Sequence, residues 1–145
     1  MFLLNEEDVR RVMQSPHGMV GSDGSAVAPE GMWANDVPHP RFYGTFPRVL
    51  GHYVREERIL PLQEAVRKMS GAPAQKLGLK DRGLLKEGYK ADITLFDPAT
   101  VKDCATFSDP QQFPEGIPYV IVNGTVVIDN GVHTGVLPGK ALRKR

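Results

Sequence analysis

The spacing of apolar residues predicts helices in the first half of the chain. Residues 6–14 carry apolar side chains three and four positions apart, which gives the segment one apolar face. Asn5 precedes it as an N-cap, and Pro16 ends it because proline disfavours helical geometry in the residue before it. The same spacing predicts a second helix capped by Thr45 and a third that begins near Pro61.

Two segments between the first and second helix lack a helical period. Residues 18–21 form an apolar run too short for a helix, and we interpret them as a short buried strand. Residues 26–44 contain three prolines and two glycines, which indicates a long loop. Because long ordered loops in compact proteins often carry function, this loop is a candidate location for a site.

The pattern in the second half of the chain indicates strands. Residues 91–97 are typical of a strand, and Asn123 and Gly124 separate two β-branched runs. Asn-Gly in that position is a strong hairpin signal, because a type I′ turn needs positive φ at both central residues. The sequence therefore predicts an α/β portion over residues 1–78 and a β portion over residues 79–145.

Composition and charge narrow the function classes. A length of 145 residues fits one domain or two small ones, and a formal net charge of +1 gives no electrostatic reason to expect nucleic acid or a membrane as partner. The single cysteine, Cys104, excludes an internal disulfide and a cysteine-based zinc cluster. No apolar stretch approaches the ~20 residues of a membrane helix, and the N-terminus lacks the basic start of a signal peptide. We therefore expect a cytoplasmic protein.

Asp23 is the most informative carboxylate. It follows the predicted strand at residues 18–21 and stands between the small residues Ser22 and Gly24. The carboxyl ends of strands carry the active sites of α/β proteins, where such a carboxylate can bind a metal or move a proton. The alternative is a turn aspartate that bonds its own backbone.

Arg41 is the second candidate. It lies in the run His39-Pro40-Arg41, and its planar guanidinium suits a carboxylate ligand, although a solvated loop arginine is the alternative. The four histidines of the chain form no His-x-His or His-Glu-x-x-His pattern. The sequence therefore offers no self-contained metal site.

Two runs of sequence resemble a known family. Residues 19–24 (MVGSDG) and 39–51 (HPRFYGTFPRVLG) resemble the N-acyl-D-amino-acid deacylases, or D-aminoacylases, of the amidohydrolase superfamily. Residues 88–97 (GYKADITLFD) and the Val122-Asn123-Gly124 turn are similar to the closing segments of that superfamily in general. The resemblance covers nearly the whole chain.

The resemblance implies a (β/α)8 barrel with a zinc site and a small β domain. Such a barrel takes ~200–250 residues, more than this chain provides. We therefore expect residues 1–78 to be the last strand and helices of the barrel, and residues 79–145 to be the C-terminal part of the small β domain.

The resemblance also implies roles for individual residues. Asp23 matches an aspartate at the metal centre that shuttles a proton from metal-bound water to the leaving amine, and Arg41 matches an arginine that grips the substrate carboxylate. We assign the neighbouring His39 and Ser25 to substrate binding as well. Because the family's other metal ligands have no counterpart here, we expect zinc in the complete enzyme and no tightly bound zinc in this chain alone.

The resulting hypothesis is a C-terminal fragment of a zinc-dependent hydrolase of N-acyl-D-amino acids, inactive alone, with the missing N-terminal part of the barrel or a second copy as partner. The alternatives are a subunit of a split amidohydrolase and a non-catalytic β-rich interaction module of hydrolase ancestry. A barrel fragment should leave apolar side chains without neighbours, and we expect this of Met19, Val20, Phe46 and Leu50.

Overall fold

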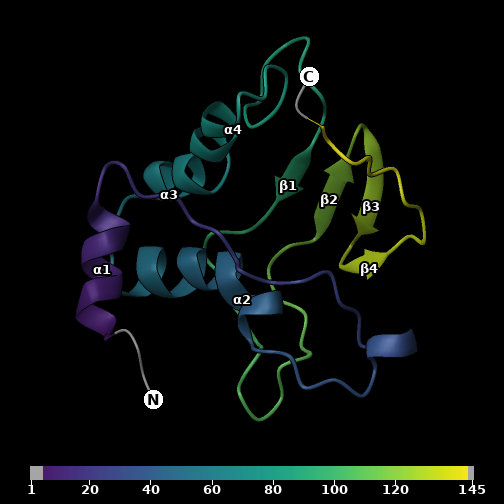
Figure 1. Ribbon diagram of the computed structural model, residues 1–145, viewed down its shortest axis with the longest axis horizontal. Helices are drawn as coiled ribbons and strands as arrows, with labels where there is room; N and C mark the ends of the chain where they lie inside the picture. The colour runs from purple at the N-terminus through teal and green to yellow at the C-terminus, as the bar shows by residue number, and fades with distance from the viewer. Residues whose placement is uncertain (1–4, 144–145) are drawn as a thin grey trace.

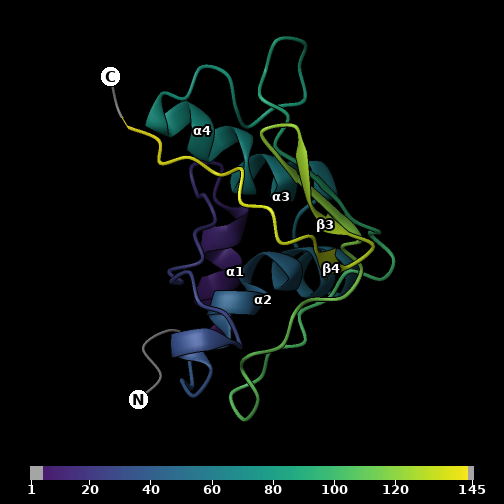
Figure 2. The same ribbon diagram turned by 90° about the vertical axis from the view of Figure 1, so that its right-hand side faces the viewer.

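Helices occupy the first part of the molecule and an antiparallel sheet the second, as Figure 1 shows for the computed structural model. The structure describes residues 5–143, so the outermost residues of the two expected portions, 1–4 and 144–145, lie outside the described residues. Viewed from the sheet side in Figure 2, β3 and β4 lie in front of the helices.

The first helix forms where the sequence predicts it. α1 spans Glu6–Gln14, and the Asn5 side chain caps it by accepting a hydrogen bond of 2.9 Å from the Asp8 amide. Its first turn contains three acidic residues, whose negative charges interact favourably with the positive end of the helix dipole. The helix ends at Ser15, before Pro16.

The second helix begins earlier than predicted. α2 spans Arg41–Arg48, so Thr45 lies inside the helix, where its hydroxyl donates to the Arg41 carbonyl oxygen at 2.9 Å instead of capping it. Pro40 stands at the N-cap with φ −51°, and its fixed φ already suits the start of a helix. The prediction of a Thr45 cap was wrong for that reason.

The chain continues from α2 into a π-helical segment, η2, at Val49–Glu56. Its wider turns are visible in the hydrogen bond from the Glu57 amide to the His52 carbonyl oxygen, five residues back, at 2.9 Å. The third predicted helix is confirmed as α3, Leu62–Met69, after Pro61. α4, Gly71–Leu77, follows and ends at Gly78 with φ +72°.

The hydrophobic core lies among these helices. Val49, Tyr53, Leu60 and Ala65 are buried together, and partly buried side chains from α1 and α3 pack against them. Lys68 is buried beside this core with only 2% of its surface exposed. Its ammonium group donates to the carbonyl oxygens of Ser15 and Gly18, the latter at 3.1 Å.

Residues 18–21 do not form the predicted strand. They have no β partner, and the Val20 amide instead donates to the Lys68 carbonyl oxygen at 3.1 Å. A strand needs a neighbouring strand to accept its backbone hydrogen bonds, and the described residues offer none at this position. The prediction of a strand was wrong for the chain on its own.

The expected apolar exposure is found at two of the four positions. Met19 and Phe46 are 44% and 40% exposed, as expected. Leu50 is 6% exposed, and Val20 is only partly buried but packs against the core cluster. The expectation was wrong for Leu50, which is buried within this chain, and for Val20, which finds neighbours in the cluster of Val49, Tyr53, Leu60 and Ala65.

Four antiparallel strands form a meander in the order β1-β2-β3-β4. They span Ile93–Leu95, Tyr119–Val122, Thr125–Asp129 and Val132–His133. Asn123 and Gly124 between β2 and β3 have φ of +48° and +80°, which confirms the predicted hairpin turn. The short strand β4 was not predicted.

The hairpin tip is tied to two other segments. The Asn123 amide donates to the Asp92 carboxylate at 2.8 Å, and the Asn123 side chain donates to the Pro138 carbonyl oxygen at 2.9 Å. Arg82 pairs with Asp92 and donates to the Asn123 side-chain oxygen at 2.7 Å. These bonds join the segment around Asp92 to the Asn123-Gly124 turn.

Among the described residues, no helix is both long and apolar enough to cross a membrane.

Candidate functional site

Asp23 and Arg41, the two candidates from the sequence, lie against each other. A carboxylate oxygen of Asp23 is 3.1 Å from a terminal nitrogen of the Arg41 guanidinium. The Asp23 side chain is 82% exposed and that of Arg41 is 44% exposed, so both groups are open to a small molecule. The structure thus brings an accessible carboxylate and an accessible guanidinium to one place.

The local backbone explains this meeting. Asp23 has φ +50°, a left-handed conformation that aspartate tolerates better than most residues. Gly24 then passes so close to α2 that an added Cβ would lie 3.1 Å from the Phe42 Cα. Arg41, as the first residue of α2, projects from the end of the helix nearest to Asp23.

His39 and Ser25 take different positions around the pair. The Nδ1 atom of His39 accepts a hydrogen bond of 3.1 Å from the Arg41 amide, and its ring lies edge-on to Phe107 at 5.0 Å between centroids. His39 thereby fixes the start of α2. Ser25 lines the wall of a hollow next to the pair.

This hollow is a feature that the sequence did not indicate. It has a volume of about 540 Å³ and opens between the loop after Asp23 and the start of α2. Its walls include Ser25, Val27, Trp33, Asp36, Val37 and Phe42. Only a general signal for a functional loop existed in the sequence, since the walls meet through tertiary folding.

In the part of the chain that the structure describes, Asp23 lacks the further metal-ligating side chains that a zinc site requires. Zinc sites in proteins use three or four nitrogen, sulfur or oxygen ligands from side chains. Within residues 5–143, the one set of three such side chains with converging ligand atoms is Glu6, His52 and Glu57, and Asp23 is not part of it. The described residues around Asp23 therefore do not fit a zinc ion by themselves.

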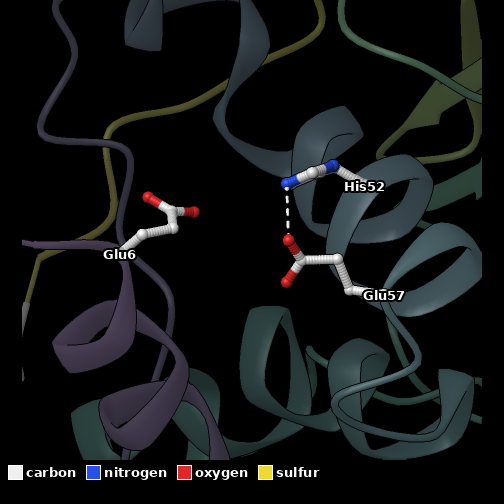
Figure 3. A group of neighbouring side chains, drawn as sticks. All are labelled: Glu6, His52 and Glu57. Carbon is white, nitrogen blue, oxygen red and sulfur yellow. Dashed lines mark ion pairs between the residues drawn. The ribbon is translucent and has the colours of Figure 1, made fainter.

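The set of Glu6, His52 and Glu57 joins α1 to η2, and Figure 3 shows the Glu6 carboxylate facing the other two side chains. One ligand atom from each lies within 4.8 Å of the others, and His52 Nε2 is 3.1 Å from Glu57. The sequence gave no sign of this cluster, because Glu6 and His52 are far apart in the chain and no local pattern links them.

The groups in this cluster already have protein partners. Arg10 donates to both Glu57 carboxylate oxygens, at 2.7 and 2.8 Å, and this hydrogen bonding lowers the pKa of Glu57. The Tyr53 hydroxyl donates to Glu6 at 2.6 Å. Burial and the neighbouring Glu6 carboxylate raise the pKa of Tyr53, so this hydroxyl stays a donor. We interpret the cluster as a polar connection between two helices.

Tyr43 is another polar group that the sequence did not single out. Its hydroxyl is buried and has no hydrogen-bond partner among the described residues, and its ring lies edge-on to Phe113 at 5.7 Å. Burial raises the pKa of this hydroxyl. The group is therefore neutral at physiological pH.

Comparison with known proteins finds relatives that match nearly the whole chain. A family model described as "Amidohydrolase family" matches residues 26–128. A D-aminoacylase from Alcaligenes xylosoxydans xylosoxydans is 45% identical over 143 residues, which are 99% of this chain and 28% of that protein. An N-acyl-D-aspartate deacylase from the same organism is 49% identical over 142 residues, which are 97% of this chain and 27% of that protein.

A solved structure gives the same picture. The N-acyl-D-glutamate deacylase from Bordetella bronchiseptica, complexed with zinc and a phosphonate inhibitor that mimics the tetrahedral intermediate, aligns with a TM-score of 0.77 and 46% identity. The alignment covers 86% of this chain and 25% of that one. The chain thus spans little more than a quarter of the length of these relatives and matches their C-terminal portion.

Proposed function

The chain belongs to the amidohydrolase family, and from that premise we propose that it supplies part of an enzyme that hydrolyses N-acyl-D-amino acids to a carboxylic acid and a D-amino acid. The observation that carries the proposal is the exposed pair of Asp23 and Arg41 beside a hollow of substrate size. A carboxylate and a guanidinium are the two groups that this hydrolysis needs from the chain.

Arg41 is the proposed binder of the substrate's α-carboxylate. Its guanidinium already pairs with a carboxylate, that of Asp23, in the structure. The planar fork of arginine takes a carboxylate through two parallel N–H···O bonds and so fixes its orientation. When the substrate carboxylate takes this place, Asp23 becomes free to act.

Asp23 is the proposed proton carrier. Its carboxylate accepts a proton from the attacking water and then donates it to the leaving nitrogen, which departs as an amine. The exposure of its side chain allows both water and substrate to reach it. His39 holds the Arg41 backbone in position, and Ser25 provides a hydroxyl in the wall of the hollow for contact with the substrate.

Zinc is the proposed cofactor of the complete enzyme, as in the deacylase structure that contains it. Since the described residues around Asp23 do not fit the ion alone, the remaining ligands must come from another part of the enzyme. Asp23 is the one residue of this chain that we assign to the metal centre.

The finer fold assignment is part of the same proposal. We propose that residues 18–21 become the last strand of a (β/α)8 barrel when neighbouring strands are present. Residues 1–78 then belong to the barrel and residues 79–145 to the C-terminal part of a small β domain. The exposure of Met19 and Phe46 supports this assignment, because barrel neighbours would cover them.

A split enzyme, in which a separate chain supplies the rest of the barrel, is the second candidate. If a separate chain supplies the other three quarters of the enzyme, the two chains should form a complex without being fused into one polypeptide. A stable chain that binds no hydrolase partner would instead favour the non-catalytic module.

A hybrid protein tests the proposal directly. The C-terminal portion of the D-aminoacylase is replaced with this chain, so that the relative supplies its own remaining sequence. We expect the hybrid to hydrolyse N-acetyl-D-amino acids and to leave N-acetyl-L-amino acids intact. A folded, zinc-loaded hybrid that hydrolyses neither would overturn the proposal.

A further inference from the structure

The hollow is next to the proposed site formed by Asp23 and Arg41. Ser25 lies two residues after Asp23, and Phe42 directly follows Arg41, and both line the hollow. The close approach of Gly24 to Phe42 joins these two walls. A substrate whose α-carboxylate is held at Arg41 therefore has the hollow within reach of the side chain on its Cα atom.

The walls are mostly apolar and carry a single ionisable group. Val27, Trp33, Val37 and Phe42 provide the apolar surface, and Asp36 is the one charged residue among the described residues that line the hollow. A carboxylate binds most strongly where a cation pairs with it through charge-assisted hydrogen bonds. These walls contain no lysine, arginine or histidine, and Asp36 repels a second negative charge.

The far wall is held in place by a second segment. The Gln111 side chain donates to the Trp33 carbonyl oxygen at 3.3 Å and to the Asp36 carbonyl oxygen at 2.5 Å. Trp33 is the last residue of the short 3-10 helix η1, Gly31–Trp33, which begins at a glycine with φ +69°. Gln111 thus ties this part of the wall to a segment far along the chain.

We infer that this hollow receives an uncharged side chain of an N-acyl-D-amino acid and thereby selects against acidic D-amino acids. The inference rests on the proposed function, which supplies the carboxylate at Arg41. It assigns Val37 and Asp36 as residues that determine specificity. The overall similarity to N-acyl-D-aspartate and N-acyl-D-glutamate deacylases does not determine which substrate side chain is accepted. In this inference, the charge of the walls determines it.

Binding to the chain itself can be followed without any enzymatic activity. Trp33 is the single tryptophan of the sequence, so intrinsic tryptophan fluorescence reports on this wall alone. The chain is titrated with N-acetyl-D-leucine, with N-acetyl-D-glutamate, and with N-acyl-D-leucines of increasing acyl length. We expect a saturable response whose Kd is at least about tenfold lower for the leucine derivative than for the glutamate derivative.

A charge change in the wall provides the decisive variant. Val37→Arg places a cation beside the hollow at a residue that is 79% exposed, so folding is not at risk. It should narrow or reverse the preference between the two ligands. Val132→Arg makes the same change in β4 at a residue that is 69% exposed, and it should leave the preference as in the wild type.

Each other outcome overturns the inference. Equal binding of both ligands, a preference for N-acetyl-D-glutamate, or no Trp33 response shows that the hollow does not select an uncharged side chain. A response that follows acyl length and ignores the side chain assigns the hollow to the acyl group instead. Equal effects of Val37→Arg and Val132→Arg show that only net charge matters.

The hybrid enzyme separates failure of this inference from failure of the proposed function. If the hybrid hydrolyses N-acetyl-D-glutamate as efficiently as N-acetyl-D-leucine, the proposed function stands and the side-chain assignment is wrong. If it hydrolyses no N-acyl-D-amino acid, the proposed function itself is wrong.

Discussion

At the scale of single residues, Asp23 and Arg41 constrain each other. Each is the other's counter-ion in the structure, and both are open to solvent. An exposed ion pair contributes little to folding, typically below ~1 kcal/mol, so substitutions at either residue should leave the fold intact. Changes in activity can then be assigned to the reaction.

Asp23→Asn in the hybrid enzyme keeps the shape of the side chain and removes the proton acceptor. We expect kcat to fall by about 10²–10⁴-fold, the usual contribution of general acid–base catalysis, with KM little changed. Steady-state kinetics with N-acetyl-D-leucine measure this. Asp129→Asn, at an exposed residue of β3, is the matched control. Near-full turnover of Asp23→Asn would refute the proton-carrier role.

Arg41→Lys keeps the charge and loses the two-pronged geometry. Since the α-carboxylate is bound in the ground state and the transition state alike, KM should rise by about 10- to 100-fold while kcat changes little. A neutral N-acyl amine without the carboxylate should be hydrolysed equally by both enzymes. An equal loss for both substrates would mean that Arg41 supports the fold and not the substrate.

The sequence located both residues of the pair but not their contact. Asp23 was noticed from its place after an apolar run, and Arg41 from its guanidinium, while their roles came from the resemblance. The 3.1 Å contact depends on the left-handed backbone of Asp23 and on a helix that starts at Arg41, where the sequence predicted a start at Thr45. The sequence did not indicate the hollow or the cluster of Glu6, His52 and Glu57 (the Glu6 cluster), because each is formed by segments far apart in the chain.

At the scale of elements, η2 packs unusually close to the loop at residues 101–102. A Cβ added to Gly51 would lie 2.7 Å from the Val101 carbonyl oxygen, which also accepts a hydrogen bond from Arg55 at 2.5 Å. Val101 is almost completely buried. The π-helical segment and the loop therefore have no free space between them at this glycine.

Gly51→Ala should therefore destabilise the protein, even though alanine is the better helix former. A backbone atom must move to admit the methyl group, and overpacking of this kind costs about 1–3 kcal/mol in the free energy of unfolding. Urea unfolding followed by circular dichroism measures it. Gly139→Ala is the control, since nothing lies within 4 Å of its added Cβ. A stability equal to the wild type would contradict the close packing.

Two glutamates paired with arginines predict an acid-sensitive fold: Glu57 pairs with Arg10 of α1, and Glu64 pairs with Arg67 within α3. Hydrogen bonds from Arg10 lower the pKa of Glu57 below its usual 4.5, and those from Arg67 lower the pKa of Glu64 to about 2. The unfolded chain thus binds more protons between about pH 4.5 and 2, so stability holds above this range and falls as the pH drops through it.

Urea midpoints at pH 7, 4 and 2.5 should show this fall. Glu57→Gln should lower the midpoint at pH 7 and reduce the loss between pH 7 and 2.5. Glu87→Gln, at an exposed position without an ion pair in the described part of the chain, should behave as the wild type. An unchanged loss in Glu57→Gln would exclude the Arg10 pair as a source of the acid sensitivity.

The elements were predictable where local signals act alone. The Asn5 cap and the Asn123-Gly124 turn are set by neighbouring residues, and both are confirmed. The strand at residues 18–21 was wrong because a strand requires partners that the sequence of the segment does not supply. β4 was missed because two residues are too short for a sequence pattern, and only their pairing with β3 defines them as a strand.

At the scale of the whole molecule, the described residues provide part of the proposed active site and not a complete set of zinc ligands. We expect no tightly bound zinc in the purified chain, because Asp23 is a single ligand and the Glu6 cluster is occupied by Arg10 and Tyr53. Metal analysis after dialysis against zinc-free buffer measures this. Near-stoichiometric zinc would contradict it, and Glu57→Gln would then show whether the ion lies in the Glu6 cluster.

The bonds around Asn123 have a consequence for how this molecule can be cut and extended. The tip of a hairpin is usually where a chain tolerates inserted peptides or new termini, because its backbone is free. Here the Asn123 amide is held by Asp92 and the Gly124 amide by the Ala91 carbonyl oxygen, while the Asn123 side chain holds Pro138. The tip is a junction of three segments, so its amide hydrogens should exchange slowly and an insertion there would detach the C-terminal segment from the sheet.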